Sequence, residues 1–266
     1  MNSVHVAVAA LMAAGGVAVA QNAPITLSDG NSTATFGAGT GFGQLGWQAD
    51  GINHLAYQTF VADLGQGAVD INDTAPTFVG TTNTNLDAGT DTLFARYNVG
   101  DLEIETLYTL RGGDSGTGAS DITELVTLTN RGNGPLTFSF WQYVNLDLAG
   151  TVDDGSAFIF GDNTAVQEDV DAGLAFVSTV VTPRATLVET GLAADVAARV
   201  FSGQDLNDNA FTSGPADLAW AFQWNFTLGA GQSVIIAADK RLVAIPTPAS
   251  AALLALGGLV ATRRRR

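Results

Sequence analysis

The sequence predicts an all-β protein, a single large antiparallel β-sandwich, and three observations support this. Apolar and polar residues alternate along most of residues 21–243, short stretches rich in Gly, Asp and Asn interrupt the alternation, and only 14% of the residues are charged. The 31 glycines suit turns between short strands better than long helices. A hydrophobic content of 46% is ample for a buried core, and no Pro- or Ser-rich linker divides the body. We therefore expect one domain of about a dozen or more strands.

The strands can be followed along the chain from this alternation. Residues 102–111 place Leu102, Ile104 and Tyr108 on one face, with Glu103 and Glu105 on the other. Residues 121–130 follow after a glycine-rich turn, so the two segments predict a hairpin with a long loop. Residues 191–201 are compatible with a short helix, but a segment that covers the space between strands is the simpler interpretation. Further strands are expected at residues 33–38, 55–64, 92–99, 136–148, 156–162, 174–181 and 185–189.

Aromatic residues mark the clearest core and ligand candidates. Residues 218–228 and 232–243 are joined by Gly-Ala-Gly-Gln, a turn of hairpin length, and predict a hairpin. The first of these segments carries an aromatic residue at every second position, which is typical of a core stripe; these residues are Trp220, Phe222, Trp224 and Phe226. Trp141 and Tyr143 lie in opposite phase to Phe138 and Phe140, so we expect one of the two sets to be exposed. Trp141 and Tyr143 are the first candidates for a ligand-facing pair.

The charge balance argues against nucleic acid as a partner. The chain has 26 acidic residues against 11 Lys and Arg, and four of those 11 are the terminal arginines. Binding to phosphate groups needs a basic face, which this body does not offer. The aspartates are interpreted as turn residues on a well-solvated surface, and an acidic surface suited to salty surroundings or to cations is the alternative.

Few residues are available for catalysis. Once a signal peptide is removed His54 is the one histidine, and the chain has neither a cysteine nor a Gly-x-Ser-x-Gly nucleophile motif. His54 precedes an apolar strand and is interpreted as a core-edge histidine with a satisfied hydrogen bond. The sequence therefore predicts a protein that is not an enzyme. The enzyme alternative is a secreted glycan hydrolase or lyase that uses His54, Tyr143 and Asp147, and a carbohydrate-binding module is a third hypothesis.

Clusters of acidic residues offer two weaker hypotheses. The pairs Glu103/Glu105 and Asp153/Asp154 have the residue type that a glycosidase needs, but a solvated surface explains them more simply. No cofactor is expected apart from calcium, which is the better chemical candidate because hard cations take several oxygen ligands from one loop. Residues 205–209 fail the EF-hand pattern, since Ala stands at both positions where Gly and Glu are needed, and an Asp/Asn-rich turn is the alternative. The calcium candidates are Asp205, Asn207, Asp208 and Asn209.

The amino-terminal segment predicts export. An apolar run that starts at Val4 ends in Ala18-Val19-Ala20, a small-x-small site for signal peptidase, and the next residues are polar. We expect signal peptidase to remove residues 1–20, with Ala18 and Ala20 as the small residues of its site. The alternative is that the segment stays in place as an uncleaved membrane anchor. No Lys or Arg precedes the run, so either Met1 is not the true start or the signal is atypical.

The carboxyl terminus carries three elements in a fixed order. Pro246-Thr247-Pro248 precedes an apolar run from Ala249 to Thr262, and four arginines close the chain. The run has 14 residues and would span about 21 Å as a helix, which is short for a bilayer core of about 30 Å. Basic residues that follow the run stay cytoplasmic by the positive-inside rule, which leaves the acidic body outside. The basic residues are Arg263, Arg264, Arg265 and Arg266.

This arrangement resembles the PEP-CTERM sorting signal of bacterial surface proteins that an exosortase processes, with Thr247 where the family usually has Glu. The resemblance implies that residues 244–266 are held briefly in the inner membrane and cut near Pro248 by an exosortase-type enzyme. The body, residues 21–243, would then reach the cell surface or the extracellular matrix, with exopolysaccharide as a candidate partner. It is similar to other bodies of this family in general style only, so no catalytic residue follows from the resemblance. The sequence therefore predicts an exported, non-enzymatic protein of the cell surface or the extracellular matrix.

Overall fold

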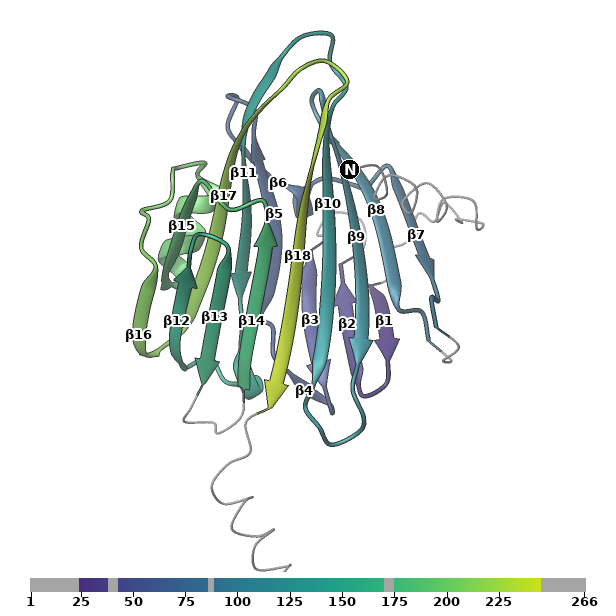
Figure 1. Cartoon of the computed structure of the whole chain (residues 1–266), viewed down its shortest axis with the longest axis vertical. Coiled ribbons are helices and arrows are strands. Elements are labelled where there is room, and N and C mark those ends of the chain that lie inside the picture. Colours follow the sequence, from purple (N-terminus) through teal and green to yellow (C-terminus); the bar gives the residue numbers. More distant parts are fainter. Residues whose placement is uncertain (1–23, 38–42, 86–88, 170–174, 245–266) are drawn as a thin grey trace, which may run out of the picture.

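A computed structural model of the chain confirms the all-β sandwich (Figure 1). It describes residues 24–37, 43–85, 89–169 and 175–244. Two antiparallel sheets, named sheet A and sheet B below, pack face to face. The predicted signal peptide, proline motif, apolar run and terminal arginines lie outside the described residues. Among the described residues, none of the helices combines the length and the apolar character needed to cross a bilayer.

Sheet A contains nine strands, most of which match the predicted segments. These are β1 (Ile25–Asp29), β2 (Ser32–Phe36), β3 (Gln44–Ala49), β4 (Ile52–Asn53), β5 (Tyr57–Asp63), β6 (Ala68–Asp70), β11 (Leu136–Asn145), β15 (Leu187–Leu192) and β17 (Leu218–Leu228). They run in the order β1-β2-β3-β5-β11-β17-β15, with β4 paired to β3 and β6 paired to β5. A 3-10 turn, η1 (Ile71–Asp73), follows β6, and a second, η2 (Leu148–Gly150), follows β11.

Sheet B also contains nine strands. These are β7 (Phe78–Thr82), β8 (Thr92–Val99), β9 (Leu102–Gly112), β10 (Ser120–Asn130), β12 (Asp154–Phe160), β13 (Thr164–Asp169), β14 (Ala175–Thr182), β16 (Phe211–Ala216) and β18 (Ser233–Ala244). They run in the order β16-β12-β13-β14-β18-β10-β9-β8-β7. The predicted hairpin of residues 102–130 is confirmed, because β9 and β10 pair from Leu102↔Asn130 to Gly112↔Ser120.

The predicted hairpin between residues 218–228 and 232–243 is wrong. The turn between them forms, but β17 belongs to sheet A, between β11 and β15, whereas β18 belongs to sheet B, between β14 and β10. Each strand already has hydrogen-bonded neighbours on both sides, so the chain crosses from one sheet to the other (Figure 1). The connection from β10 to β11 makes the same crossing beside it, and Asn130 joins the two: its Nδ2 donates to the Leu228 oxygen (2.9 Å) and its backbone N donates to Gln232 (3.0 Å).

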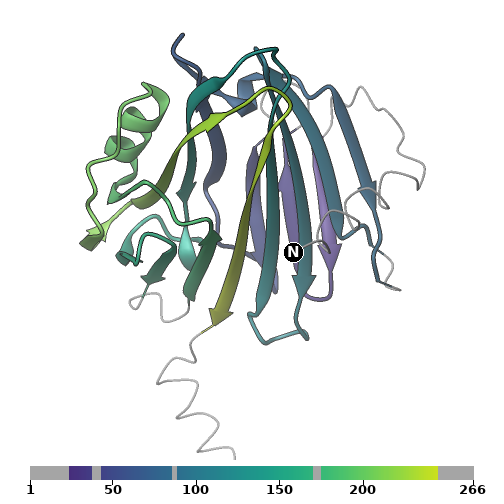
Figure 2. The same ribbon diagram turned by 45° about the horizontal axis from the view of Figure 1, so that its top comes forward.

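The predicted aromatic stripe of β17 lies in the core between the sheets. Trp220, Phe222 and Trp224 are buried there, and Phe226 is partly buried against the same cluster. The other face of β17 is buried as well, because the helix α2 (Ala193–Phe201) covers the outer surface of sheet A. Figure 2 shows α2 on the side of sheet A that faces away from sheet B. Residues 193–201 thus form the short helix that the sequence allowed but did not favour, and this helix lies over the outer face of sheet A.

A charged pair lies inside the main core and is joined to both sheets. Lys240 of β18 forms an ion pair with Glu124 of β10, and each side chain is 1% exposed. From sheet A, Gln58 donates to Glu124 Oε1 (2.6 Å) and Gln142 donates to its Oε2 (2.8 Å). Lys240 Nζ donates to Gln44 Oε1 (3.2 Å) and also to Gln58. The polar groups of the pair are therefore satisfied by each other and by amides of the facing sheet.

Candidate functional site

A surface groove of about 580 Å³ lies at the edge of the sandwich, where α2 meets β15. Its volume is within the range of small-molecule sites in proteins. Three elements line it: β15 with Glu189 and Thr190, α2 with Asp195 and Arg199, and the segment 204–209 that leads back to β16. The remaining polar side chains of the lining come from that segment, and they are Gln204, Asn207 and Asn209.

Glu189 is the most firmly held of the groove side chains. It is 5% exposed, and its Oε2 lies 3.1 Å from Arg199 Nε. Asn207 donates to it twice, from its backbone N to Oε2 (2.9 Å) and from Nδ2 to Oε1 (3.1 Å). The Arg199 guanidinium thus balances its negative charge, and the two Asn207 donors fix the orientation of the carboxylate.

The segment 204–209 has few backbone hydrogen bonds of its own and is held by side chains. Gln223 of β17 accepts from the Leu206 backbone N (2.9 Å) and donates from Nε2 to Asp205 Oδ1 (2.6 Å). Asn209 Nδ2 donates to the Thr190 oxygen (2.7 Å), and the Thr190 N donates back to the Asn209 oxygen (2.7 Å). This wall of the groove is therefore tied to both β15 and β17.

The helix α2 packs closely against β15 at Gly191. A Cβ atom there would lie 3.1 Å from Val196 Cγ2, so Val196 would have to shift by a few tenths of an ångström to accept a side chain. With the helix in place, Arg199 reaches Glu189 across the groove, and Asp195, one turn earlier, is exposed on the same side. The groove thus presents one held carboxylate, one exposed carboxylate, one guanidinium and several amides, groups that form hydrogen bonds to hydroxyl-rich ligands.

The segment predicted to bind calcium forms part of this groove, but its side chains do not converge. Asp205 accepts from Gln223, Asn207 donates to Glu189, and Asn209 donates to Thr190. Asp208 has a φ of 59°, a left-handed turn conformation that Asp tolerates. Among the described residues, no group of three or more His, Cys, Asp or Glu side chains could hold a metal ion. These contacts are those of an Asp/Asn-rich turn.

The structure does not bring His54, Tyr143 and Asp147 into the groove, which other residues line. His54 is buried, its Nδ1 accepts from the Ala149 backbone N (3.1 Å), and burial lowers the pKa of the imidazole to about 4. Tyr143 donates to the Ala193 oxygen (3.2 Å), and burial raises the pKa of its phenol well above the ordinary value. Burial and the nearby Asp217 raise the pKa of Asp147.

The prediction that Trp141 and Tyr143 face a ligand is wrong. Both lie on the outer face of sheet A, as their phase indicates, but they are 1% and 4% exposed because α2 covers them. Phe138 and Phe140, on the opposite face, are buried in the main core, so neither set is exposed. The physical reason is that sheet A packs against sheet B on one side and against α2 on the other, so its central strands are buried on both faces.

The two acidic pairs singled out in the sequence lie elsewhere. Glu105 forms an ion pair with Arg96 (2.6 Å), and Glu103 forms one with Arg131. These ion pairs agree with the interpretation of a solvated strand face. Asp153 is exposed in the connection that precedes β12.

Sequence reasoning missed Glu189, Asp195, Arg199 and Gln204 as site residues. The pattern of α2 offered one signal, since Asp195 and Arg199 are four residues apart and share a helix face. Glu189 gave no signal, because it follows two apolar residues of a short strand and its partners lie 10 and 18 residues further along the chain. Only the tertiary structure brings these residues together.

The fold and the groove define a class of protein: a two-sheet antiparallel sandwich with a polar surface groove. No family model and no curated protein matches the chain. Among solved structures, it is similar to a bacterial glucoamylase complexed with acarbose, with a TM-score of 0.55 and 10% identity over 92% of this chain. The chain spans only 36% of that glucoamylase.

Two further solved structures match over nearly their full length. A putative aldose 1-epimerase from Escherichia coli K12 has a TM-score of 0.51 and 12% identity, with 84% of this chain and 99% of that one covered. A protein from Synechocystis sp. has a TM-score of 0.55 and 8% identity, with 86% of this chain and 99% of that one covered. At these identities the similarity establishes the fold alone.

These similarities correct the prediction that the chain is not an enzyme. That prediction depended on the scarcity of recognisable catalytic motifs in the sequence. The chain instead adopts a fold shared with proteins named as a glucoamylase and a putative aldose 1-epimerase, which are carbohydrate-active enzymes. A scarcity of motifs is weak ground for that prediction, because residues that act together can come from positions far apart in the sequence.

Proposed function

We propose that the protein is a glycan hydrolase that binds its substrate in the groove between α2 and β15. The observation that carries the proposal is that two carboxylates, Glu189 and Asp195, line one open groove of a fold shared with carbohydrate-active enzymes. Hydrolysis of a glycosidic bond generally uses two carboxyl groups, one that activates water and one that protonates the leaving oxygen. Arg199 and the amide-bearing segment 204–209 supply donors for sugar hydroxyls.

The two carboxylates have different surroundings, which assigns them different roles in the proposal. Glu189 is buried and oriented by Arg199 and Asn207, so it acts as the base that accepts a proton from the attacking water. Asp195 is exposed in the first turn of α2 and faces the open groove, so the proposal gives it the role of the acid that donates a proton to the departing sugar oxygen. Water bonds to the anomeric carbon as the glycosidic bond breaks, and the two proton transfers balance the reaction.

The charge of the molecule favours a neutral glycan as substrate. The chain has a formal net charge of −15, and the guanidinium of the groove is already paired with Glu189. A uronate or sulfated sugar would therefore approach an acidic protein through a site without a free cation among the lining residues. We expect neutral hexose polymers to bind and acidic polysaccharides to bind poorly.

We propose that the enzyme works outside the cytoplasm. Support comes from the predicted signal peptide and from the resemblance of residues 244–266 to an exosortase-processed tail. In this proposal the inner membrane holds the protein briefly, an exosortase-type enzyme removes the tail, and the body meets exopolysaccharide at the cell surface.

Reducing-sugar release from neutral glycans, together with calorimetric binding, tests the hydrolase. We expect the wild-type protein to cleave at least one such glycan, and E189Q and D195N each to lose about 100-fold or more in rate while still binding. E105Q is the matched control, because Glu105 is a carboxylate of sheet B paired with Arg96 outside the groove. Binding without cleavage by the wild-type protein would contradict the hydrolase, and full activity of E189Q would exclude the groove as its site.

A further inference from the structure

The buried ion pair between Lys240 and Glu124 has a third member, the carboxamide of Gln58 on β5. Glu124 Oε1 accepts from Gln58 Nε2 (2.6 Å) and pairs with Lys240 Nζ, and the same Nζ donates to Gln58 Oε1. Each of the three side chains is 1% exposed. An amine, a carboxamide and a carboxylate therefore contact one another inside the core, and they come from three strands and both sheets.

The surroundings of Lys240 favour the neutral form of its amine. Burial lowers the pKa of the amine, although the contact with Glu124 opposes this shift. The Nζ atom lies 5.9 Å from the centre of the buried Trp47 ring. In such a medium, transfer of a proton from Nζ to the Glu124 carboxylate replaces two buried charges by two neutral groups. The uncharged amine has the free electron pair that a nucleophile needs.

Three amides surround the pair, and their contacts single out Gln58. Gln44 accepts from the amine through Oε1 (3.2 Å), while its Nε2 donates to a backbone oxygen (3.5 Å). Gln142 donates to Oε2 of the carboxylate (2.8 Å). Of the three, Gln58 is the one whose carbonyl oxygen contacts the amine and whose Nε2 contacts the carboxylate. Its carbonyl carbon is thus beside a nucleophile, and its amide nitrogen is beside a group that can protonate it.

We propose that Lys240 and Gln58 form an intramolecular isopeptide bond, with Glu124 as the catalytic residue. Glu124 takes a proton from Nζ, and Nζ then bonds to Cδ of Gln58. The Cδ–Nε2 bond breaks as Glu124 protonates Nε2, which leaves as ammonia, and a second Nζ proton passes to Glu124. One C–N bond forms, one breaks, and no group is oxidised or reduced. The product is a secondary amide beside a protonated carboxyl group, so no charge remains buried at the site.

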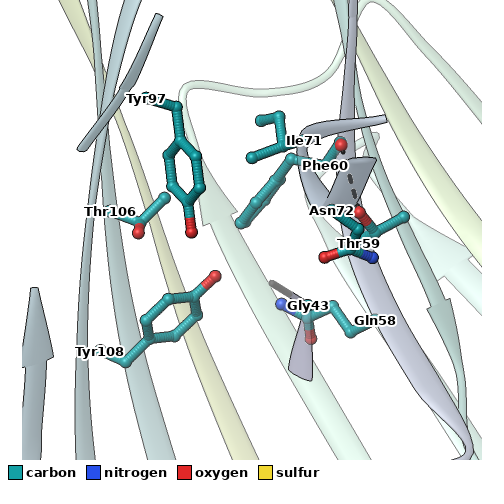
Figure 3. Close-up of a pocket in the computed structure, with 9 residues that line it drawn as sticks. All are labelled: Gly43, Gln58, Thr59, Phe60, Ile71, Asn72, Tyr97, Thr106 and Tyr108. Carbon is teal, nitrogen blue, oxygen red and sulfur yellow. Dashed lines mark hydrogen bonds between the residues drawn. The ribbon is translucent and has the colours of Figure 1, made fainter. Parts of the chain in front are cut away.

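The site has room for the leaving group, and the bond joins distant parts of the fold. Figure 3 shows Gln58 among the residues that line a cavity of about 10 Å³ between the sheets. A cavity of this size holds about one molecule of the size of water, and ammonia is of that size. The bond links β5 of sheet A to β18 of sheet B, across 182 positions of a chain that has no cysteine for a disulfide.

Peptide mapping of the purified wild-type protein by mass spectrometry tests the bond. We expect one joined fragment that contains Gln58 and Lys240, lighter than the sum of its two parts by about 17 Da, the mass of ammonia. Because Lys240 is the one lysine of the chain, an amine-reactive reagent applied to the denatured protein should label no lysine. The joined fragment carries more weight than the intact mass, since an amino-terminal Gln21 also loses ammonia when it cyclises. Separate fragments, with a Lys240 that reacts with the reagent, would overturn the proposal.

Three substitutions test the role of each group. Q58L removes the carboxamide and E124Q removes the proton carrier, so each should lose about 90% or more of the joined fragment. Q44L is the matched control, because it removes an equally buried amide that contacts the same amine, and it should keep the fragment. A joined fragment in Q58L, or its loss in a folded Q44L, would contradict the assignment. The wild-type fragments decide the matter should a variant fail to fold.

The bond and the ion pair can be measured separately. K240M and K240M/E124Q both lack the amine, so neither forms the bond. A difference in stability between these two variants therefore reports the buried charge alone, whereas the joined fragment reports the bond alone.

Discussion

Single residues of this protein show how burial decides chemistry that the residue type leaves open. His54 is the one histidine of the body, and it is buried with its Nδ1 accepting a backbone hydrogen bond. Because burial lowers the pKa of the imidazole from 6.5 to about 4, the folded protein holds the neutral form and disfavours protonation. The residue therefore acts as a pH-dependent structural group.

This pKa shift predicts a loss of stability in mild acid. The unfolded chain binds a proton on His54 below about pH 6.5, whereas the folded protein does so only below about pH 4. The stabilisation is fully present above pH 6.5 and is lost as the pH falls towards 4, by about 3 kcal/mol in all. Urea unfolding across this range should show a larger decline for the wild-type protein than for H54N, whose amide can accept the same bond without titrating. An equal decline of the free energy of unfolding in both proteins would contradict the assignment of this pH dependence to His54.

Substitutions of the buried Lys240–Glu124 pair should have effects on the free energy of unfolding that do not add. K240M leaves the Glu124 carboxylate buried without its counter-ion and should lower the free energy of unfolding by about 3–5 kcal/mol. The double variant K240M/E124Q removes both charges and should recover most of that loss, because Gln58 and Gln142 can still bond to a neutral amide. Chemical denaturation of the two single variants and the double variant measures the coupling. A double variant as unstable as the sum of its parts would show that the charges do not act as a pair.

At the scale of elements, alternation located the strands but not their neighbours. Residues 102–111 and 121–130 pair as predicted because they stay in the same sheet. The strands β17 and β18 have a shorter connection, residues 229–232 against residues 113–119, yet they lie in different sheets, and each inserts between two other strands. Local sequence encodes the turn, whereas the choice between pairing and crossing depends on which distant strands are available on either side.

The helix α2 explains why the faces of β11 could not be assigned from the sequence. Both faces carry aromatic residues, and alternation alone does not tell which face meets the second sheet. A nine-residue helix covers Trp141 and Tyr143, and it also supplies Asp195 and Arg199 to the groove. One short element therefore determines both the failure of the predicted aromatic site and the position of the observed groove.

A charge on the buried face of α2 should uncover the outer face of sheet A. V196D places a carboxylate among apolar residues and should cost about 3 kcal/mol of stability, with a red shift of tryptophan fluorescence as Trp141 meets water. A194D is the matched control, because Ala194 is exposed in the same first turn, where an acidic residue is favourable. Equal stability and equal emission spectra in the two variants would show that α2 does not protect Trp141.

For the whole molecule, the fold and the proposed processing are compatible. The first described strand begins at Ile25 and the last ends at Ala244. A cut after Ala20 and a second near Pro248 would therefore leave every described strand and the groove intact. The pairing of β18 with both β10 and β14 holds the carboxyl-terminal strand in the centre of sheet B, so loss of the segment beyond it removes no described sheet contact.

Processing at both ends predicts a defined mass for the mature protein. Mass spectrometry of the protein purified from its native host should show an amino terminus at Gln21 and a carboxyl terminus near Pro248, without the terminal arginines. Deletion of Arg263 to Arg266 should keep the tail from being cut, because the basic cluster fixes its orientation in the membrane. An otherwise identical chain in which the four arginines are replaced by lysines keeps the charge and is the matched control. Mature protein that still carries all four arginines on most copies would contradict the sorting proposal. It would leave the hydrolase proposal untouched, because all the residues that line the groove fall within positions 189–209.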